Sequence, residues 1–477
     1  MSIKYNKKTK IVATLGPACS SKEVLLQMIQ NGVDVVRINF SHADYEDVKT
    51  KVKLVREINE EFGYNTAILG DLQGPKLRVG IVKEGEVLKN GEILTFTNQK
   101  IEGDASRVYM TYQLFPQDVN VGERILIDDG KLILEVTATN NKDEVKAKVI
   151  QGGPFKSKKG VNLPNTKISL PALTEKDIED AIFAIDNNFD WLALSFVRTG
   201  ADIIDLKNLI KKFGTHKIPI IAKIEKPEGV KNIVEILEEA DGLMVARGDL
   251  GVEIPMEEVP LIQKRLVDTA KIMRKPAIIA TQMMETMINS LTPTRAEVND
   301  VANSVMDGAD AVMLSGETSV GDYPAEVIEA MSKIIRKVEN DPHITVPAHV
   351  PNCLDDRYIT NSICYAAVQV AKHSEAKAVI SLTYSGYTAF QISSHRPNCN
   401  IIVFTSNKTI LPMLNLLWGV RAFYHKREDS STDDTVIRVN RFLLKVRLVE
   451  QNDIVINLNA MPLTEKGTTN TLRMTYI

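Results

Sequence analysis

The stretch IIAKIEKPEGVKNIVEILEEADGLMVARGDLG, residues 220–251, decides the fold of this chain of 477 residues. It places Lys223 and Glu225 at the end of one expected strand and Asp249 just after the next. Strand side chains alternate between faces, so Lys223 and Glu225 are expected to point into one pocket. Carboxylate oxygens suit Mg2+, which takes one or two carboxylates and leaves its other positions to water and substrate phosphate. The stretch therefore predicts phosphate chemistry, although an ordinary ion pair and a turn that enters a helix would also explain it.

Eight short apolar runs of this kind occur in the first two thirds of the chain, separated by stretches with helical period. This alternation is typical of a parallel sheet with covering helices. Eight βα units predict a closed (β/α)8 TIM barrel. The runs are KIVATL from Lys10, VDVVRINF from Val33, TAILGDL from Thr66, DWLALSF from Asp190, IPIIAKIE from Ile218, DGLMVA from Asp241, KPAIIAT from Lys275 and ADAVMLS from Ala309.

Two further domains are expected around this barrel. The third and fourth runs are roughly a hundred residues apart, far beyond an ordinary βα connection, so a domain is inserted there. Alternation in EVKAKVI and the Asp-Gly turn in ILIDDGKLILEV predict an inserted β-barrel lid domain at residues 75–170. The catalytic barrel then comprises residues 1–74 and 171–343. Residues 344–477 are expected to form a C-terminal α/β domain, with strand signals at AVISLT, NIIVFT, VRAFY, DIVINL and NTLRMTYI.

The composition excludes several classes of protein. A hydrophobic fraction of 44%, 25% charged residues and a net charge of −3 describe a globular protein with no bias toward polyanions, so we expect no nucleic-acid partner. The four cysteines form no CxxC pair and no set with metal-ligand spacing, so a cytoplasmic location fits better than a disulfide framework or a zinc site. The basic start MSIKYNKKTK runs into the short segment IVATLG, far less than a signal-peptide core or a membrane span.

Polar side chains gather at the expected C-terminal ends of the eight strands, where barrels of this kind carry their active sites. Any one of them is as well explained by a cap or a turn, but the convergence of so many predicts a site. These residues are Arg37, Asn39, Ser41, Asp71, Ser195, Lys223, Glu225, Asp249, Thr281, Ser315 and Glu317.

Five long motifs extend the argument to a family. They read VVRINFSH, IAKIEKPEG, MVARGDLGVEI, ATQMMETM and PTRAEVNDVANSVMDGADAVMLSGET. With them the chain resembles the pyruvate kinases over essentially its whole length. The resemblance implies Mg2+-dependent transfer of the phosphoryl group of phosphoenolpyruvate to ADP, giving pyruvate and ATP in the last step of glycolysis. It also implies a mobile lid, a regulatory C-terminal domain and a homotetramer.

The resemblance assigns roles to the charged residues. Glu225 and Asp249 are expected to hold Mg2+, and Lys223 to stabilise the phosphoryl group in flight, where fixed cations matter more than covalent chemistry. Arg37 is expected to contact the same phosphoryl group, and Ser195 belongs to the expected substrate site.

The resemblance places the substrate carboxylate at the start of the helix after the sixth strand, because a helix N-terminus favours an anion. Its cradle is expected to be the backbone of Ala246, Arg247, Gly248 and Asp249. Thr281 is expected to bond the substrate, or alternatively to satisfy its own backbone. Ser315 and Glu317 are expected to support a water relay that protonates the enolate, or to form only a strand-end turn.

Nucleotide contacts are expected from both domains. Arg78 and Lys159, the latter in SKKGVNLP on the lid, match ligands of the nucleotide phosphates. His42 and Asn39 are further candidates, although His42 could equally be a structural histidine. Closing the lid would bring Lys159 in and exclude water from the reaction.

In the segment GDLQGPKLRVG, Leu72, Gln73, Lys76 and Val79 resemble the branch of the family that does not require K+, and the segment departs from the members that need it. Those members hold K+ at the positions of Asn39, Ser41, Asp71 and the Leu72 carbonyl, and carry glutamate where this chain has Lys76. We hypothesise that the Lys76 ammonium replaces the monovalent cation and that K+ is not required. The alternative is that Lys76 is a solvated loop residue and K+ still binds.

A phosphorylated effector is expected in the C-terminal domain. The loop TYSGYT lies between a strand and a helix, so the hydroxyls and backbone of Thr383, Ser385, Gly386 and Thr388 could cradle its phosphate. The later loop AMPLTEKGTTN lacks the Trp- and Arg-bearing pattern of the members activated by fructose bisphosphate, which favours a sugar monophosphate or a nucleotide. The alternative is a capping loop without a ligand.

Two other functional classes stay open from sequence. One is a lyase that uses Mg2+ to stabilise a pyruvate enolate on a similar barrel, and Arg78 and Lys159 argue against it because a lyase needs no ADP site. The other is a silent metabolite sensor, against which the intact Lys223, Glu225, Asp249 and Thr281 argue.

Overall fold

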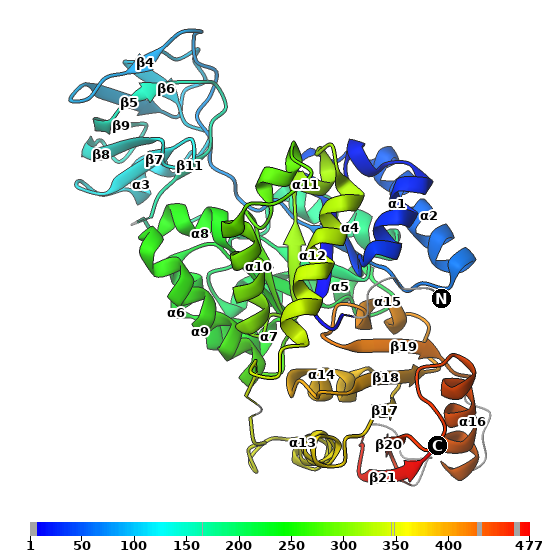
Figure 1. The fold of residues 1–477 in the computed structure, drawn as a ribbon. Coiled ribbons are helices and arrows are strands. Elements are labelled where there is room, and N and C mark those ends of the chain that lie inside the picture. The colour runs from blue at the N-terminus through cyan, green and yellow to red at the C-terminus, as the bar shows by residue number, and fades with distance from the viewer. Residues whose placement is uncertain (1–6, 165, 345, 348, 427–431, 462–467) are drawn as a thin grey trace.

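The structure, a computed structural model, describes residues 7–164, 166–344, 346–347, 349–426, 432–461 and 468–477, without the side chains of His42 and Thr432. Its centre is a closed barrel of eight parallel strands (Figure 1). All eight apolar runs are strands of this barrel, so the TIM-barrel prediction is confirmed. The strands are β1 (Lys10–Thr14), β2 (Val35–Asn39), β3 (Ala67–Asp71), β12 (Trp191–Leu194), β13 (Ile220–Ile224), β14 (Gly242–Ala246), β15 (Ala277–Ala280) and β16 (Ala311–Leu314).

Helices cover the outside of the barrel (Figure 1). Capping boxes start α4 (Glu175–Asp186) and α10 (Arg295–Met306), among others. The Thr174 hydroxyl accepts from the Asp177 N–H, and the Thr174 N–H donates to the Asp177 carboxylate; Thr294 and Glu297 form the same pair of bonds. The α-helices are α1 (Lys22–Asn31), α2 (Tyr45–Phe62), α4 (Glu175–Asp186), α5 (Gly200–Phe213), α6 (Pro227–Lys231), α7 (Ile233–Glu239), α8 (Arg247–Glu253), α9 (Val259–Ile272), α10 (Arg295–Met306), α11 (Gly316–Ser319) and α12 (Pro324–Glu339). Short 3-10 helices are η1 (Pro17–Cys19), η2 (Phe40–His42), η3 (Met256–Glu258) and η4 (Glu285–Ile288).

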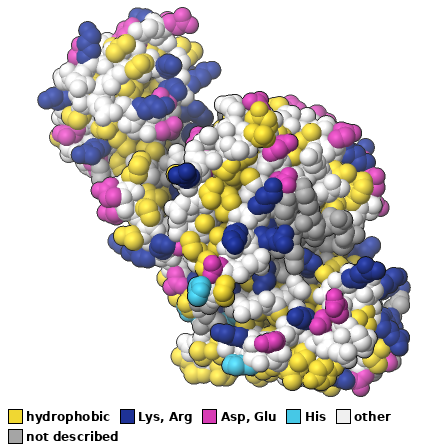
Figure 2. Space-filling view, in the orientation of Figure 1, with side chains coloured by type: hydrophobic (Ala, Val, Ile, Leu, Met, Phe, Trp, Pro, Cys, Tyr) yellow, Lys and Arg dark blue, Asp and Glu magenta, His cyan; other side chains and the backbone are white. Residues whose placement is uncertain are grey.

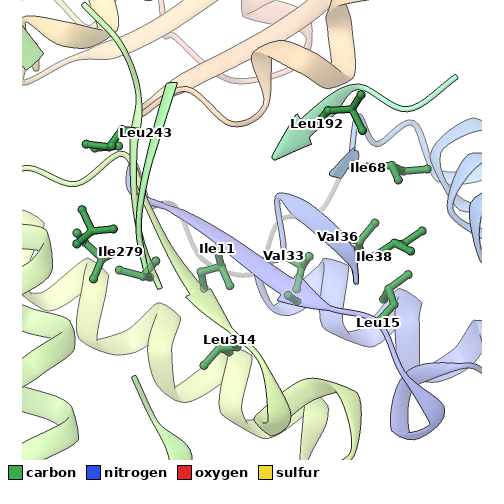
Figure 3. Close-up of a cluster of buried hydrophobic side chains, with 14 of the residues drawn as sticks. Ile11, Leu15, Val33, Val36, Ile38, Ile68, Leu192, Leu243, Ile279 and Leu314 are labelled. Atoms are coloured by element: carbon green, nitrogen blue, oxygen red, sulfur yellow. The ribbon is translucent and has the colours of Figure 1, made fainter. Parts of the chain in front are cut away.

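Strand alternation divides the barrel into two cores. Residues of one parity, such as Ile11, Ile68 and Leu192, pack outward against the helices (Figure 3). Residues of the other parity, such as Val12 and Leu69, fill the barrel interior. The interior is a packed core rather than a pore, which is usual for eight strands.

The inserted segment between β3 and α4 folds mainly as β strands, and Figure 2 shows it as a separate lobe joined to the barrel. It forms a six-stranded sheet in the order β11-β7-β8-β9-β5-β6 and a two-stranded sheet of β10 and β4 around one apolar core. Isolated bridges join Arg78 to Gly160, beside β11, and Val79 to Met110, beside β6, so one segment links both edges of the larger sheet. The elements are β4 (Val87–Leu88), β5 (Ile93–Thr97), β6 (Arg107–Tyr109), α3 (Phe115–Asp118), β7 (Arg124–Ile127), β8 (Leu132–Thr139), β9 (Glu144–Gln151), β10 (Gly153–Pro154) and β11 (Val161–Asn162).

The C-terminal part is an α/β unit with a five-stranded sheet in the order β19-β18-β17-β20-β21, in which only β21 is antiparallel. All five strand signals of the sequence are strands here. The elements are α13 (Tyr358–His373), β17 (Ala378–Leu382), α14 (Tyr387–Ser394), β18 (Asn400–Thr405), α15 (Ile410–Leu414), β19 (Val420–Tyr424), α16 (Thr432–Lys445), β20 (Ile454–Asn459) and β21 (Thr471–Tyr476). The domain boundaries after residues 74, 170 and 343 stay predictions.

The C-terminal unit packs against the barrel at the end opposite the lid (Figure 1). Leu416 belongs to the interior core of the barrel, and the Trp191 indole donates to the Met413 carbonyl at 3.0 Å. The buried Arg396 guanidinium bonds both oxygens of Asp310, at 3.0 and 2.9 Å. Among the described residues, no helix is long and apolar enough to cross a membrane.

Candidate active site

The predicted site residues continue the interior parity of the barrel at its lid end. Arg37 follows Val35 by two positions, and Lys223 follows Ile221 by two; Val35 and Ile221 both belong to the interior core. Side chains two apart on a strand share a face, so these residues converge where the packed core ends. Asp71 and Ser195 extend the third and fourth barrel strands in the same way.

Asp71 is the centre of a buried charge cluster. Its Oδ2 lies 2.6 Å from Arg37 Nε, and its Oδ1 lies 3.1 Å from Lys223 Nζ. Burial acts to raise the pKa of this carboxyl, but the two cations outweigh it and hold the pKa below its ordinary value. Arg37 also donates to the Thr14 hydroxyl at 3.0 Å, which fixes the direction of its guanidinium.

Lys223 is held by three oxygens. Its Nζ lies 3.1 Å from Asp71 Oδ1 and 3.1 Å from Glu225 Oε1, and donates to Ser195 Oγ at 2.6 Å. Burial acts to lower its pKa, but the carboxylates of Asp71 and Glu225 outweigh it, so the pKa is raised and the ammonium stays charged. The site therefore presents a fixed, buried cation.

Glu225 and Asp249 are near enough to influence each other electrostatically. Glu225 Oε2 accepts from the backbone of Phe196 at 2.7 Å. Burial and the charge of Asp249 raise the pKa of Glu225, while Lys223 opposes the shift. A buried carboxylate with a second acidic side chain nearby is suited to a divalent cation. In the described part of the chain no three acidic, His or Cys side chains gather closely enough to hold a metal alone.

The start of α8 is attached firmly to the end of β15. Arg247 binds both oxygens of Asp300, at 2.6 and 2.8 Å, and donates to the Thr281 carbonyl at 2.6 Å. The Thr281 hydroxyl donates to the Ala280 carbonyl at 2.6 Å and accepts from Gly248 N at 2.8 Å. Thr281 thus satisfies its own backbone, the alternative left open above, while also contacting the expected carboxylate cradle. Its φ of 70° is a left-handed conformation that is rare outside glycine.

Glu317 braces a turn at the end of β16. Its two oxygens accept from the backbone of Ser315 at 2.7 Å and of Met284 at 3.2 Å, and the side chain is buried. This geometry is that of the strand-end turn weighed above. A role in proton delivery for Ser315 and Glu317 stays a prediction.

The expected nucleotide ligands on the lid contact lid residues in this structure. Lys159 Nζ lies 2.8 Å from Asp128 Oδ1, and Arg78 donates to the Lys158 carbonyl at 3.0 Å. Most of the lid extends to one side of the barrel end (Figure 1), although Asn162 of the lid contacts Glu253 on α8. The side chain of His42 lies outside the described residues.

Three of the expected monovalent-cation ligands, Asn39, Asp71 and the Leu72 carbonyl, already have protein partners. Asn39 Oδ1 accepts from Ser41 N at 3.1 Å, which caps η2, and the Leu72 carbonyl accepts from the Ser195 hydroxyl at 2.6 Å. Asp71 pairs with two cations, as described. Lys76 is exposed and lines a small pocket between lid and barrel, together with Asp249.

The expected effector loop starts α14. Gly386 has a φ of 85°, and its N–H donates to Thr383 Oγ1 at 3.0 Å. Ser385 is exposed, whereas the buried Thr388 hydroxyl bonds that of Thr469 at 2.9 Å. Residues 462–467 of the later loop lie outside the described residues.

Sequence reasoning missed two residues of the site. Thr14, which orients Arg37, shares the interior parity of Val12 at the end of β1, and that signal was available. Asp300, which holds Arg247, lies on α10 and carries no pattern that separates it from a surface acid. Only its position opposite Arg247 identifies it.

This fold and site define a class of enzyme. A TIM barrel carries buried cations and paired carboxylates at its C-terminal end, beneath an inserted β lid with further cations. Fixed cations of this kind suit the stabilisation of developing negative charge and paired carboxylates are typical ligands of a divalent metal, which together are features of a phosphotransferase.

The comparisons with known proteins identify the family. Residues 6–328 match the description "Pyruvate kinase, barrel domain" and residues 361–475 match "Pyruvate kinase, alpha/beta domain". A pyruvate kinase of Corynebacterium efficiens is 42% identical over 98% of this chain and 97% of its own length, and one of Mycobacterium tuberculosis is 41% identical over 98% and 97%. A crystal structure of a pyruvate kinase from Cryptosporidium parvum superimposes with a TM-score of 0.90 at 33% identity, covering 98% of this chain and 96% of that one. The chain belongs to the pyruvate kinase family.

Proposed function

We propose that this chain transfers the phosphoryl group of phosphoenolpyruvate to ADP with Mg2+, forming pyruvate and ATP. The observation that carries the proposal is the buried Lys223 ammonium, 3.1 Å from both Asp71 and Glu225 at the lid end of the barrel. Phosphoryl transfer spreads negative charge over the moving oxygens, and a preorganised cation stabilises that charge without reorganising. Family membership supports the same reaction.

Different residues of the site bind the phosphoryl group, the metal ion and the substrate carboxylate in this proposal. Lys223 and Arg37 face the transferring phosphoryl group, with Ser195 steadying Lys223 through their 2.6 Å contact. Glu225 and Asp249 hold Mg2+, which when bound adds positive charge against the phosphoryl oxygens. The α8 N-terminus receives the substrate carboxylate on the backbone of Ala246, Arg247, Gly248 and Asp249, beside Thr281.

The lid completes the site when it closes. Lys159 and Arg78 then reach the ADP phosphates, with Asn39 and His42 as further contacts. Closure excludes water, which would otherwise compete with ADP by hydrolysing the phosphoryl group. Protonation of the enolate follows near Thr281, and Ser315 is the candidate that lies on the neighbouring strand end.

We further propose that K+ is not required. Asp71 already pairs with two cations and the Leu72 carbonyl already accepts from Ser195, which supports a site that needs no added monovalent charge. Lys76 supplies the remaining positive charge as the lid moves, because it lies at the junction between lid and barrel.

Regulation is proposed for the C-terminal unit. A phosphorylated effector binds at the start of α14, where the Ser385 hydroxyl is exposed and the backbone turns at Gly386. Substrate-saturation curves with sugar monophosphates and nucleotides test this, and curves that none of them shifts would remove the effector. The proposed homotetramer is tested by light scattering.

The experiment that tests the reaction is pyruvate formation from phosphoenolpyruvate, ADP and Mg2+, run in parallel with K+ and with tetramethylammonium. We expect turnover in both. Turnover only with K+ would keep the kinase and discard the role of Lys76. No turnover in either, with effectors added, would overturn the kinase and favour a lyase or a sensor, which aldol cleavage without ADP would distinguish.

A further inference from the structure

A second buried ion pair lies directly beside the two proposed metal ligands. Lys226 follows Glu225 in the chain, and Glu253 ends α8, which carries Asp249. Lys226 Nζ lies 2.6 Å from Glu253 Oε1, and the two side chains are 8% and 0% exposed. Two charges removed so fully from water need a structural reason, since their desolvation is costly.

The position of the pair supplies that reason. Residues four apart on a helix share a face and are about 6 Å apart along its axis, so Glu253 lies one turn beyond Asp249 on the same side of α8. Its partner Lys226 is the next residue after Glu225. The ion pair therefore joins the chain at one metal ligand to the helix face that carries the other, and it limits how far α8 can move from the end of β13.

Glu253 also receives a contact from the lid. Asn162, in β11, donates its side-chain amide to the same Oε1 at 2.8 Å. The other oxygen, Oε2, is buried without a hydrogen-bond partner among the described residues. Asn162, Lys226, Asp249 and Glu253 line one small pocket between lid and barrel, close to where Figure 1 shows α8 below the lid. Glu253 is thus the point where α8, the end of β13 and the lid meet.

We propose that Lys226 and Glu253 are positioning residues that hold Glu225 and Asp249 at the separation a divalent cation requires. The inference rests on the proposed function, which assigns the metal to those two carboxylates. Neither Lys226 nor Glu253 touches the reacting groups; they act through the placement of the ligands. Groups that orient metal ligands typically change metal affinity by about 10- to 100-fold when they are removed.

The test uses Mn2+ as the probe with the full-length protein, freed of metal, and measures free Mn2+ by electron paramagnetic resonance. In K226M/E253L both charges are replaced by apolar side chains, which avoids leaving one buried charge unpaired. We expect its Kd for Mn2+ to rise about 10- to 100-fold while its urea unfolding midpoint stays near that of the wild type. The Mg2+ concentration for half-maximal rate should rise similarly, with kcat at saturating Mg2+ less affected.

The control, matched in pair length and substitutions but more exposed to solvent, is K207M/E239L. Lys207 and Glu239 form an ion pair of the same 2.6 Å length between the outer helices α5 and α7. This control should bind Mn2+ like the wild type. Wild-type affinity in a folded K226M/E253L would overturn the inference.

Two further variants keep the test decisive. If K226M/E253L does not fold, E253Q retains the shape and weakens the pair, and an unchanged Mn2+ Kd in E253Q would overturn the positioning role. E225Q tests the metal assignment: wild-type Mn2+ binding by E225Q would overturn the proposed metal site itself. Lost binding in E225Q with normal binding in K226M/E253L would overturn only the present inference.

Discussion

Replacing Lys223 by methionine is the sharpest perturbation of the site. The substitution keeps most of the side-chain volume and removes the positive charge of Lys223. Loss of one preorganised group of this kind costs about 10²- to 10³-fold in rate, so kcat should fall by at least that factor. The structure adds that Lys223 neutralises two buried carboxylates, so the loss has consequences beyond the missing cation.

The two carboxylates respond differently to this loss. Asp71 keeps Arg37 at 2.6 Å and stays paired. Glu225 loses its cation, and burial, which already raises its pKa, then acts unopposed by Lys223. Its pKa should therefore rise further, and the protonated carboxyl is a poor metal ligand. We expect Mn2+ binding by K223M to weaken as pH falls, over a higher pH range than in the wild type.

The assay for K223M combines three measurements. Steady-state pyruvate formation gives kcat, paramagnetic resonance gives Mn2+ affinity from pH 6 to 8, and urea unfolding gives stability. Breaking a buried pair costs about 3–5 kcal/mol, and protonation of Glu225 limits the loss to the lower part of that range. Lys217→Met is the control, because Lys217 pairs with Asp241 at 2.6 Å near the other end of β13 and is exposed. A K223M rate within a few fold of the wild type would refute the reasoning.

Three further predictions follow from single side chains. Burial, with smaller contributions from neighbouring charged groups, lowers the pKa of His395 to about 3. The folded state therefore holds this histidine neutral, whereas the unfolded chain binds a proton below about pH 6.5. The contribution of His395 to folding stability is complete above that pH and is lost as the pH falls toward the folded-state pKa. Between pH 7 and pH 5 the free energy of urea unfolding should fall by about 2 kcal/mol more in the wild type than in His395→Phe. Equal falls in the two proteins would contradict the lowered pKa of His395. Arg247→Lys cannot bind both oxygens of Asp300, so the KM for phosphoenolpyruvate should rise about 10-fold or more in steady-state assays, with kcat changing less. Lys159→Ala should raise the KM for ADP without a measurable change in unfolding midpoint, because its pair with Asp128 is partly exposed and worth less than about 1 kcal/mol.

Much of the fold was predictable from local pattern. Each barrel strand is a short apolar run with turn residues at its ends, and this signal needs no knowledge of the rest of the chain. The same alternation indicated which polar residues would share a face, so the meeting of Lys223 with Glu225 was correctly predicted. That Lys223 also contacts Asp71 follows from the barrel, since parallel strands bring their C-terminal ends together.

The hydrogen-bond partners of individual polar side chains were less predictable. For Thr281 the sequence left open a bond to the substrate or to its own backbone; its hydroxyl bonds Ala280 and Gly248, and its contact with substrate stays a prediction. Glu317 was weighed as part of a proton relay, and its oxygens are taken by two backbone N–H groups. Hydroxyls and carboxylates have several possible partners nearby, and the backbone geometry of each strand end selects among them.

The sequence by itself determined the eight strands, the β character of the insert, the α/β character of the C-terminal unit and the shared face of Lys223 and Glu225. These follow from hydrophobic period and turn chemistry, which act over a few residues. Only the tertiary structure decided that Asp300 holds Arg247, that Lys226 pairs with Glu253 and that Leu416 fills the barrel interior. Each of these contacts joins residues far apart in the chain. Whether such residues meet in space depends on how whole helices and strands pack, and no local sequence pattern records it.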